Sequence, residues 1–164
     1  MVAENDAGRE TYSRPPTDED VKKICRALNE KGAEYLIVGG LAMNFHGFVR
    51  MTHDIDLLIN PSPENVKKVI DALSVLPDNA AQEVGFNDVQ KYTVVRIADE
   101  VVVDLIGKIG DVTTKNAKIV ELQVEGVKIP IADVNTMIKT KQGYREKDRE
   151  DLAYLRMKKK ERKK

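Results

Sequence analysis

Two aspartates on one expected strand are the residues of this sequence best suited to chemistry. Asp54 and Asp56 lie in the run 53–59, whose last three positions are all apolar. Because side chains alternate between the faces of a strand, both carboxylates point the same way, while Ile55 and Leu57 point into the core. Neighbouring carboxylates repel each other, and a divalent cation would compensate them; hard oxygen ligands favour Mg²⁺ or Mn²⁺. The other interpretation is a solvent-facing strand end whose carboxylates pair with Arg or Lys.

A third carboxylate, Asp104, interrupts the apolar run 101–106. A buried aspartate without a partner is costly, so Asp104 needs one. If this strand lies beside that of Asp54, the three carboxylates could hold two metal ions, an arrangement suited to in-line phosphoryl transfer. Asp104 could also accept the proton of an attacking hydroxyl. The competing interpretation is an aspartate at a strand end that is bonded to a loop.

Two adjacent glycines, Gly39 and Gly40, lie between an expected buried strand at 34–38 and an expected short helix at 41–48. Glycines there let the backbone approach a ligand closely, and the start of a helix attracts phosphate. Such turns are common, but this one precedes the aspartate pair within a strand–helix–strand unit. If the two strands are neighbours, a phosphate cradle and the metal ligands lie side by side.

The other patterns predict the elements that must position these residues. They are a helix capped by Thr17 that stops at Lys31-Gly32, a helix from 61 to about 76, hairpins of 91–97 with 101–106 and of 118–124 with 127–131, a helix from Asp133 to about Gly143, and a last helix from about Arg145 past Arg156. We expect one α/β (α+β) domain over residues 17–157, a mixed β-sheet with flanking helices and C-terminal helices. A flexible leader at 1–16 precedes it, and a basic tail at 158–164 follows.

Composition and charge limit the number of domains, the cellular location and the kinds of ligand that the chain can have. The chain has 164 residues, 41% of them hydrophobic and 33% charged, which suits one domain with a well-solvated surface. Its single cysteine, Cys25, cannot form an internal disulfide and favours a cytoplasmic location, and no apolar run is long enough to cross a membrane. The net charge is zero, yet residues 139–164 carry twelve Lys or Arg against five Asp or Glu. This end could hold a polyanion near the carboxylates, or residues 158–164 could act only as a solubilising tail.

Together these motifs resemble the DNA polymerase beta-type nucleotidyltransferase superfamily and its nucleotidyltransferase fold. The matching pieces are Val38-Gly39-Gly40, Asp54-Ile55-Asp56-Leu57 and Val103-Asp104-Leu105. A finer pattern is similar to the small AbiEii-like (abortive-infection type) stand-alone members: Gly40-x-Ala42, His46-Gly47, Arg50-x-Thr52-x-Asp54 and Arg145-Glu146-Lys147-Asp148-Arg149-Glu150-Asp151-Leu152. One position departs from the pattern of toxin-paired members, which often have serine where this chain has Gly40.

The resemblance implies roles for individual residues. Asp54, Asp56 and Asp104 would be catalytic and bind metal. Nucleotide-binding residues would be Gly39 and Gly40 on the triphosphate, Arg50 and Thr52 on phosphate or bracing the loop, and Lys139, Lys141, Arg145 and Lys147 on the leaving pyrophosphate. For each of these basic residues alone, a solvated helix face is an equally good interpretation. Neither His46 nor His53 is assigned a catalytic role.

The leading hypothesis is therefore an enzyme, a Mg²⁺-dependent (or Mn²⁺-dependent) nucleotidyltransferase that moves a nucleoside monophosphate from a triphosphate to an acceptor hydroxyl. ATP and the other triphosphates present the same groups to these residues. The acceptor could be tRNA, a protein or a small molecule, held by a partner protein or a second copy of the chain. The alternative is a nucleotide- or RNA-binding partner of a toxin–antitoxin pair with little catalysis. A purely structural domain would leave Asp104 unexplained.

Overall fold

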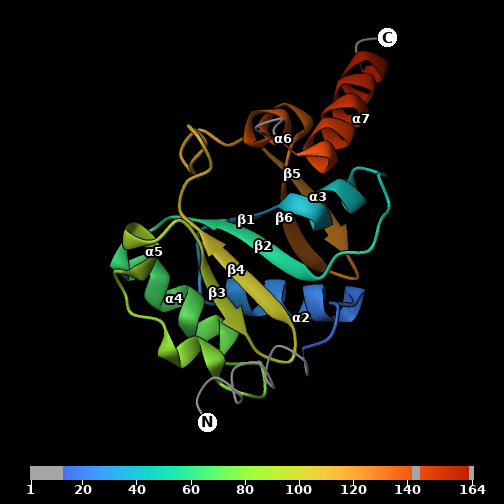
Figure 1. Ribbon diagram of the computed structural model, residues 1–164. Coiled ribbons are helices and arrows are strands. Elements are labelled where there is room, and N and C mark those ends of the chain that lie inside the picture. Colours follow the sequence, from blue (N-terminus) through green and yellow to red (C-terminus); the bar gives the residue numbers. More distant parts are fainter. Residues whose placement is uncertain (1–12, 142–144, 163–164) are drawn as a thin grey trace.

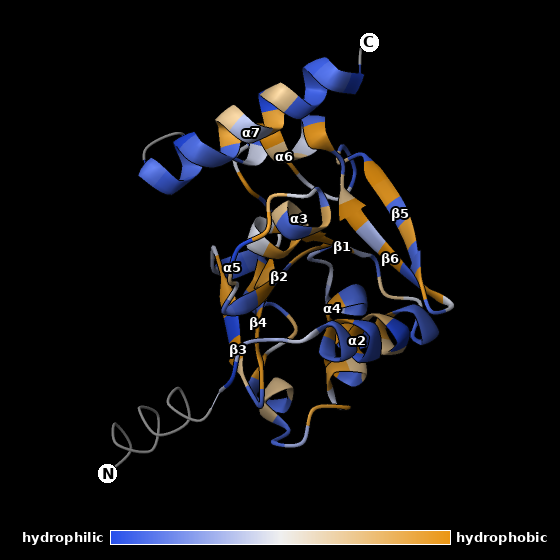
Figure 2. Ribbon diagram, turned by 90° about the vertical axis from the view of Figure 1, so that its right-hand side faces the viewer, coloured by the Kyte–Doolittle hydropathy of each residue, from blue (hydrophilic) through white to orange (hydrophobic). Residues whose placement is uncertain are grey.

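The computed structural model describes residues 13–141 and 145–162. Its elements are α2 (Asp18–Glu30), β1 (Tyr35–Val38), α3 (Gly39–Phe45), β2 (Asp54–Ile59), α4 (Pro63–Leu73), the 3-10 helix η1 (Ala80–Glu83), α5 (Asp88–Lys91), β3 (Val95–Ala98), β4 (Val102–Ile106), β5 (Ile119–Val124), β6 (Val127–Ala132), α6 (Val134–Thr140) and α7 (Glu146–Arg162). The strands form one six-stranded sheet in the order β3-β4-β2-β1-β6-β5. Helices α2 and α4 lie on one side of this sheet, and α3, α6 and α7 on the other (Figures 1 and 2).

The pairing of the strands decides which side chains meet. β2 lies antiparallel to β1 and parallel to β4, with Asp56 opposite Val38 on one side and opposite Asp104 on the other. β3 and β4 form an antiparallel hairpin in which Arg96 is opposite Asp104. β5 and β6 form the second hairpin, and β6 lies parallel to β1. The sheet is therefore mixed, and its centre carries the acidic residues.

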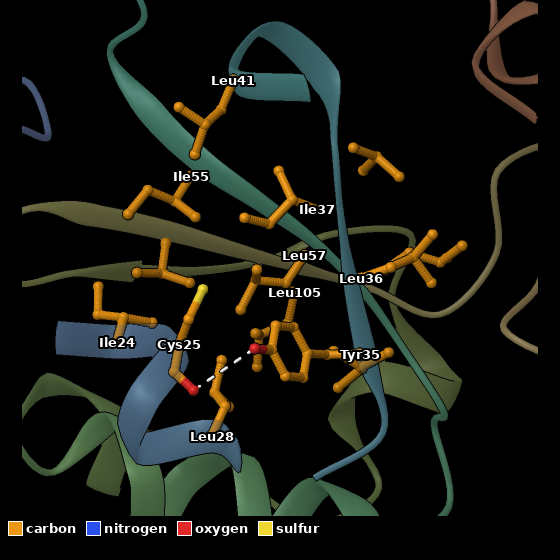
Figure 3. Packing of buried hydrophobic residues seen from close by; sticks show 14 of the residues in the cluster. Ile24, Cys25, Leu28, Tyr35, Leu36, Ile37, Leu41, Ile55, Leu57 and Leu105 are labelled. Atoms are coloured by element: carbon orange, nitrogen blue, oxygen red, sulfur yellow. Dashed lines mark hydrogen bonds between the residues drawn. The ribbon is translucent and has the colours of Figure 1, made fainter. Parts of the chain in front are cut away.

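The face of the sheet that α2 and α4 cover is apolar. Ile55, Leu57 and Leu105 point into it and meet Ile24 and Leu28 of α2 (Figure 3). Alternation along β2 therefore places Asp54 and Asp56 on the opposite face, as the sequence predicts.

The start of α2 and its buried cysteine both match the sequence. Thr17 caps the helix in a capping box with Asp20. Cys25 lies inside the core, and burial raises the pKa of its thiol to about 11, which keeps it protonated and unreactive.

The turn between β3 and β4 is fixed by the buried side chain of Asp99. Its carboxylate accepts hydrogen bonds from the backbone N–H groups of Asp78 and Ala80, both at 3.0 Å, and of Glu100 at 2.7 Å. The turn is therefore held to the segment before η1, and the register of the hairpin is fixed with it.

Helix α7 is polar on most of its surface and is attached by a few side chains. Leu155 is fully buried. The Tyr154 ring lies 4.9 Å from that of Phe48, and its hydroxyl donates to the His46 carbonyl at 2.8 Å. Within the described residues, no helix is long and apolar enough to span a membrane.

The predicted fold class is confirmed, and the differences lie at element ends. The first hairpin strand begins at Val95 instead of residue 91, because β4 offers partners only for 95–98 and residues 88–91 form α5. The helix after β1 begins at Gly39 and ends at Phe45, ahead of Gly47, whose φ is +102°. α4 ends at Leu73 rather than near 76.

α6 ends at Thr140, ahead of the expected end near Gly143, because the backbone is already extended at Lys141. Most of the leader and the last two residues of the basic tail lie outside the described residues. Residues 158–162 of that tail continue α7. The proposed domain limits, 17–157 with a leader and a tail, remain predictions.

Candidate active site

Three carboxylates converge on the open face of β2 and β4. One oxygen each from Asp54, Asp56 and Asp104 lies within 4.8 Å of the others. Asp104 is nearly buried at 5% exposure, whereas Asp54 and Asp56 are partly exposed. β2 and β4 are neighbours, which is the condition under which the sequence predicts a shared cluster, and their pairing brings the three side chains to one point.

Gly39 lies against this cluster and has no room for a side chain. Its φ is +69°, and a Cβ at this position would stand 2.1 Å from Oδ2 of Asp56. At Gly40 a Cβ would approach the Thr52 side chain to 3.0 Å. The glycine turn thus lets the Asp56 carboxylate pack directly against the backbone, which no other residue at position 39 would allow.

Burial and mutual repulsion both disfavour the charged forms of these carboxylates. Burial first, and then the charges of Asp54 and Asp104, raise the pKa of Asp56 to about 7. Burial and the neighbouring Asp104 also raise the pKa of Asp54. A cluster in which ionisation is this costly is suited to bind a cation, because a cation would remove the cost.

Arg96 of β3 compensates part of this charge. Its Nε and one terminal nitrogen donate to the two oxygens of Asp104 at 2.9 and 3.0 Å, and the same terminal nitrogen reaches Asp54 at 3.1 Å. These hydrogen bonds raise the pKa of Arg96 above its usual value. The arginine side chain is 55% exposed, so it can leave the cluster without unfolding the sheet. Among the described residues, no Lys or Arg forms an ion pair with Asp56.

The donor set fits a divalent cation. It consists of three carboxylates, which are hard oxygen ligands, on two hydrogen-bonded strands that hold them in place. The absence of a side chain at Gly39 lets the Asp56 carboxylate take its place in this cluster. Hard divalent cations such as Mg²⁺ prefer such oxygen-only sites.

A pocket of about 420 Å³ opens beside Asp56. Gly39 lies on one wall, and Lys141 and Arg145 lie on another. Two of the basic residues expected to meet phosphate are therefore placed near the carboxylates. Lys139 is not, because it lines a different cavity formed by the loop at 110–116 and Thr136.

Arg50 braces the fold rather than facing the pocket. Its guanidinium pairs with both oxygens of Asp151 in α7, at 2.5 and 2.9 Å, and Lys141 pairs with the same carboxylate at 2.8 Å. Burial would raise the pKa of Asp151, but the hydrogen bonds from these two cations outweigh it and lower that pKa. Of the two roles predicted for Arg50 and Thr52, contact with phosphate or support of the loop, the geometry of Arg50 favours support. Thr52 contacts Gly40.

Lys147 and Asp148 are adjacent in α7, so their side chains point to different sides of the helix. Asp148 is buried and accepts hydrogen bonds from Arg145, while Lys147 is exposed and its charge lowers the pKa of Asp54.

The two histidines lie outside the acidic cluster. His46 is buried, its Nε2 lies 2.7 Å from the Ala132 carbonyl, and burial lowers its pKa. His53 is exposed.

The sequence interpretation missed Arg96. The signal was present, because a hairpin turning at residues 99–101 pairs position 96 with position 104. The burial of Asp151 was also missed, although the residue belonged to a quoted motif. Neither residue was expected to be catalytic or to bind nucleotide. Arg96 pairs with Asp104 and Asp54, and Asp151 pairs with Arg50 and Lys141, all of which were.

Comparison with known proteins identifies a family for the chain. A family model described as "Nucleotidyl transferase of unknown function" matches residues 17–164. A candidate nucleotidyltransferase from Thermotoga maritima shares 16% identity and a TM-score of 0.49, covering 85% of this chain and 83% of its own. An antigenic nucleotidyltransferase-like protein from Paracoccidioides brasiliensis shares 16% identity and a TM-score of 0.50, covering 86% of this chain and 77% of its own. No curated protein matches by sequence.

Proposed function

The chain belongs to this nucleotidyl transferase family, and from that premise we propose that it moves a nucleoside monophosphate from a nucleoside triphosphate to an acceptor hydroxyl. The observation that carries the proposal is the meeting of Asp54, Asp56 and Asp104 beside the side-chain-free turn at Gly39. Such a cluster of carboxylates repels a triphosphate unless a cation lies between them. We therefore expect the triphosphate and the cation to bind together at this site.

We assign Mg²⁺, or Mn²⁺, to the three carboxylates. Bound there, the cation would neutralise their charge and polarise the phosphate being transferred. The raised pKa of Asp56 supports this assignment, since a cation would restore its charged form.

The residues of the chain then have separate tasks. The turn at Gly39, which lines the pocket beside Asp56, contacts the phosphates. Lys141 and Arg145, across the pocket, neutralise the departing pyrophosphate. The acceptor oxygen forms a bond to the α-phosphorus, and the bond from that phosphorus to the bridging oxygen breaks. Asp104 accepts the proton of the acceptor hydroxyl.

The test is transfer of label from each α-labelled triphosphate, with Mg²⁺ and a cell lysate as the source of acceptors. Asp54→Asn and Asp104→Asn should each lower transfer more than about 100-fold, because each removes a cation ligand. Asp71→Asn, on the exposed face of α4, is the matched control and should transfer normally.

Thermal unfolding of each variant separates lost activity from a lost fold. Transfer retained by the folded double variant Asp54→Asn/Asp56→Asn would refute the proposal. The labelled product also identifies the nucleotide and the acceptor.

The alternative, a nucleotide- or RNA-binding partner in a toxin–antitoxin pair, requires no catalysis. Phosphate binding alone is served by basic groups, and three mutually repelling carboxylates oppose it. The acidic cluster therefore favours the enzyme.

A further inference from the structure

A third cavity, of about 710 Å³, lies at the C-terminal ends of β2 and β4. Its walls are drawn from residues 60–62 after β2, residues 89–93 at the end of α5, and residues 107–115 after β4. These three segments lie on the same side of the molecule as α5 (Figure 1). We call this space the lysine cavity.

The charged residues that line the lysine cavity are all positive. They are Lys91, Lys108 and Lys115, and no Asp or Glu is among its lining residues. All three lysines are exposed, and none forms an ion pair with another described residue. Three unpaired positive charges around a concave surface attract a polyanion.

An aromatic ring lies among these charges. Tyr92 lines the cavity and is 55% exposed, and the Lys91 ammonium stands 5.7 Å from its ring centroid. An exposed aromatic face beside a basic groove is the arrangement that binds single-stranded nucleic acid, since bases stack on the ring while phosphates meet the cations. An acidic peptide would use the lysines but would have no base to stack on Tyr92.

The lysine cavity shares a wall with the acidic pocket. Ile106 and Ile109 line the pocket of Asp56, while Gly107, Lys108 and Gly110 line the lysine cavity. Gly107 follows Asp104 by three residues, which is about 10 Å along an extended strand. The two spaces are therefore close neighbours at the end of β4, and the end of a chain held in the lysine cavity has only a short distance to span to the carboxylates.

We propose that the lysine cavity binds a single-stranded nucleic acid and that a terminal hydroxyl of this strand is the acceptor in the proposed transfer. Lys91, Lys108 and Lys115 contact its phosphates, and Tyr92 stacks on a base. The acceptor role depends on the proposed function, whereas binding in the lysine cavity does not.

Binding is measured by fluorescence anisotropy with a short 5′-labelled single-stranded RNA, without nucleotide. Lys108→Ala/Lys115→Ala should weaken binding at least about tenfold and reduce the salt slope by about 0.7 per lysine. Tyr92→Ala should weaken binding about tenfold or more by removing the stacking platform. Lys67→Ala/Lys68→Ala removes the same charge from the exposed face of α4 and should leave affinity within about twofold, as for surface charges distant from the bound strand.

Three results would overturn the proposal. One is equal loss of affinity in the α4 control, and another is unchanged affinity in Tyr92→Ala. The third is displacement of the RNA by polyglutamate as effective as by unlabelled RNA. Thermal unfolding checks that each variant is folded; all the substituted residues are exposed.

A second measurement separates this proposal from the proposed function. Asp54→Asn should still bind the RNA while transferring nothing. Label that enters another acceptor, but never an RNA bound in the lysine cavity, refutes the acceptor role and leaves the transferase intact. RNA binding without transfer to any acceptor refutes the transferase and leaves the binding site intact.

Discussion

Arg96 shows at the level of one residue how the acidic cluster is held together. It contacts both oxygens of Asp104 and one oxygen of Asp54, so it occupies positions that a cation would use. A guanidinium and a divalent cation near the same carboxylates repel each other, and removing the guanidinium should strengthen cation binding.

We therefore predict that Arg96→Met binds Mn²⁺ about tenfold or more tightly than the wild-type chain, as measured by calorimetric titration at pH 8. Arg96→Lys, which keeps the charge, should change the affinity much less. Equal affinities for the wild type and Arg96→Met would show that Arg96 and the cation do not compete.

The ionisation of Asp56 makes the stability of the protein depend on pH. Its pKa in the folded protein is about 7, above the value of 3.8 in an unfolded chain. The folded state therefore binds the extra proton between these two values, and the free energy of unfolding falls as the pH rises through about 4 to 7. Above that window the metal-free protein contains a carboxylate that is costly to ionise.

Asp56→Asn cannot ionise, so in the presence of a chelator at pH 8 it should be more stable than the wild type by on the order of 2–4 kcal/mol. Urea unfolding measures this difference. Added Mg²⁺ should stabilise the wild type and have little effect on the variant. A variant less stable than the wild type at pH 8 would contradict this account of Asp56.

At the scale of elements, the attachment of α7 depends on Asp151. This carboxylate is fully buried and pairs with Arg50, from the segment before β2, and with Lys141, from the end of α6. The Nε of Arg50 is buried and has no hydrogen-bond partner, so Asp151 provides the hydrogen bonds that hold the guanidinium. One acid thus connects α7 to the loop that precedes β2.

Asp151→Ala leaves two cations close together in a buried site, so we expect it to destabilise the chain by about 3–5 kcal/mol in urea unfolding. Glu150→Ala, at the exposed neighbouring position on α7, is the control and should stay within about 0.5 kcal/mol of the wild type. A small effect of Asp151→Ala would mean that α7 is held by Leu155 and Tyr154 instead.

Across the whole molecule, local patterns were enough to predict a mixed sheet and the face on which Asp54 and Asp56 lie. The motifs taken together also predicted a nucleotidyltransferase, and a nucleotidyl transferase family matches the chain. The similarity to the abortive-infection subgroup, the nucleotide and the partners remain predictions.

Long-range pairing could not be predicted in the same way. The residues around Arg50 and Asp151 do not predict that the two side chains meet, because 101 residues separate them and a salt bridge leaves no periodic pattern in the sequence. Lys139 and Lys141 look equivalent in sequence, yet the end of α6 at Thr140 sends them into different cavities.

The turn at Asp99 has a consequence for how this chain can change in length. Because successive residues of a strand face opposite sides, a one-residue shift of β3 against β4 would turn Arg96 away from Asp104. A two-residue shift would keep the side but move the arginine along the strand. Since the contacts of Asp99 fix this register, homologous chains should keep the short connection of β3 to β4 at constant length.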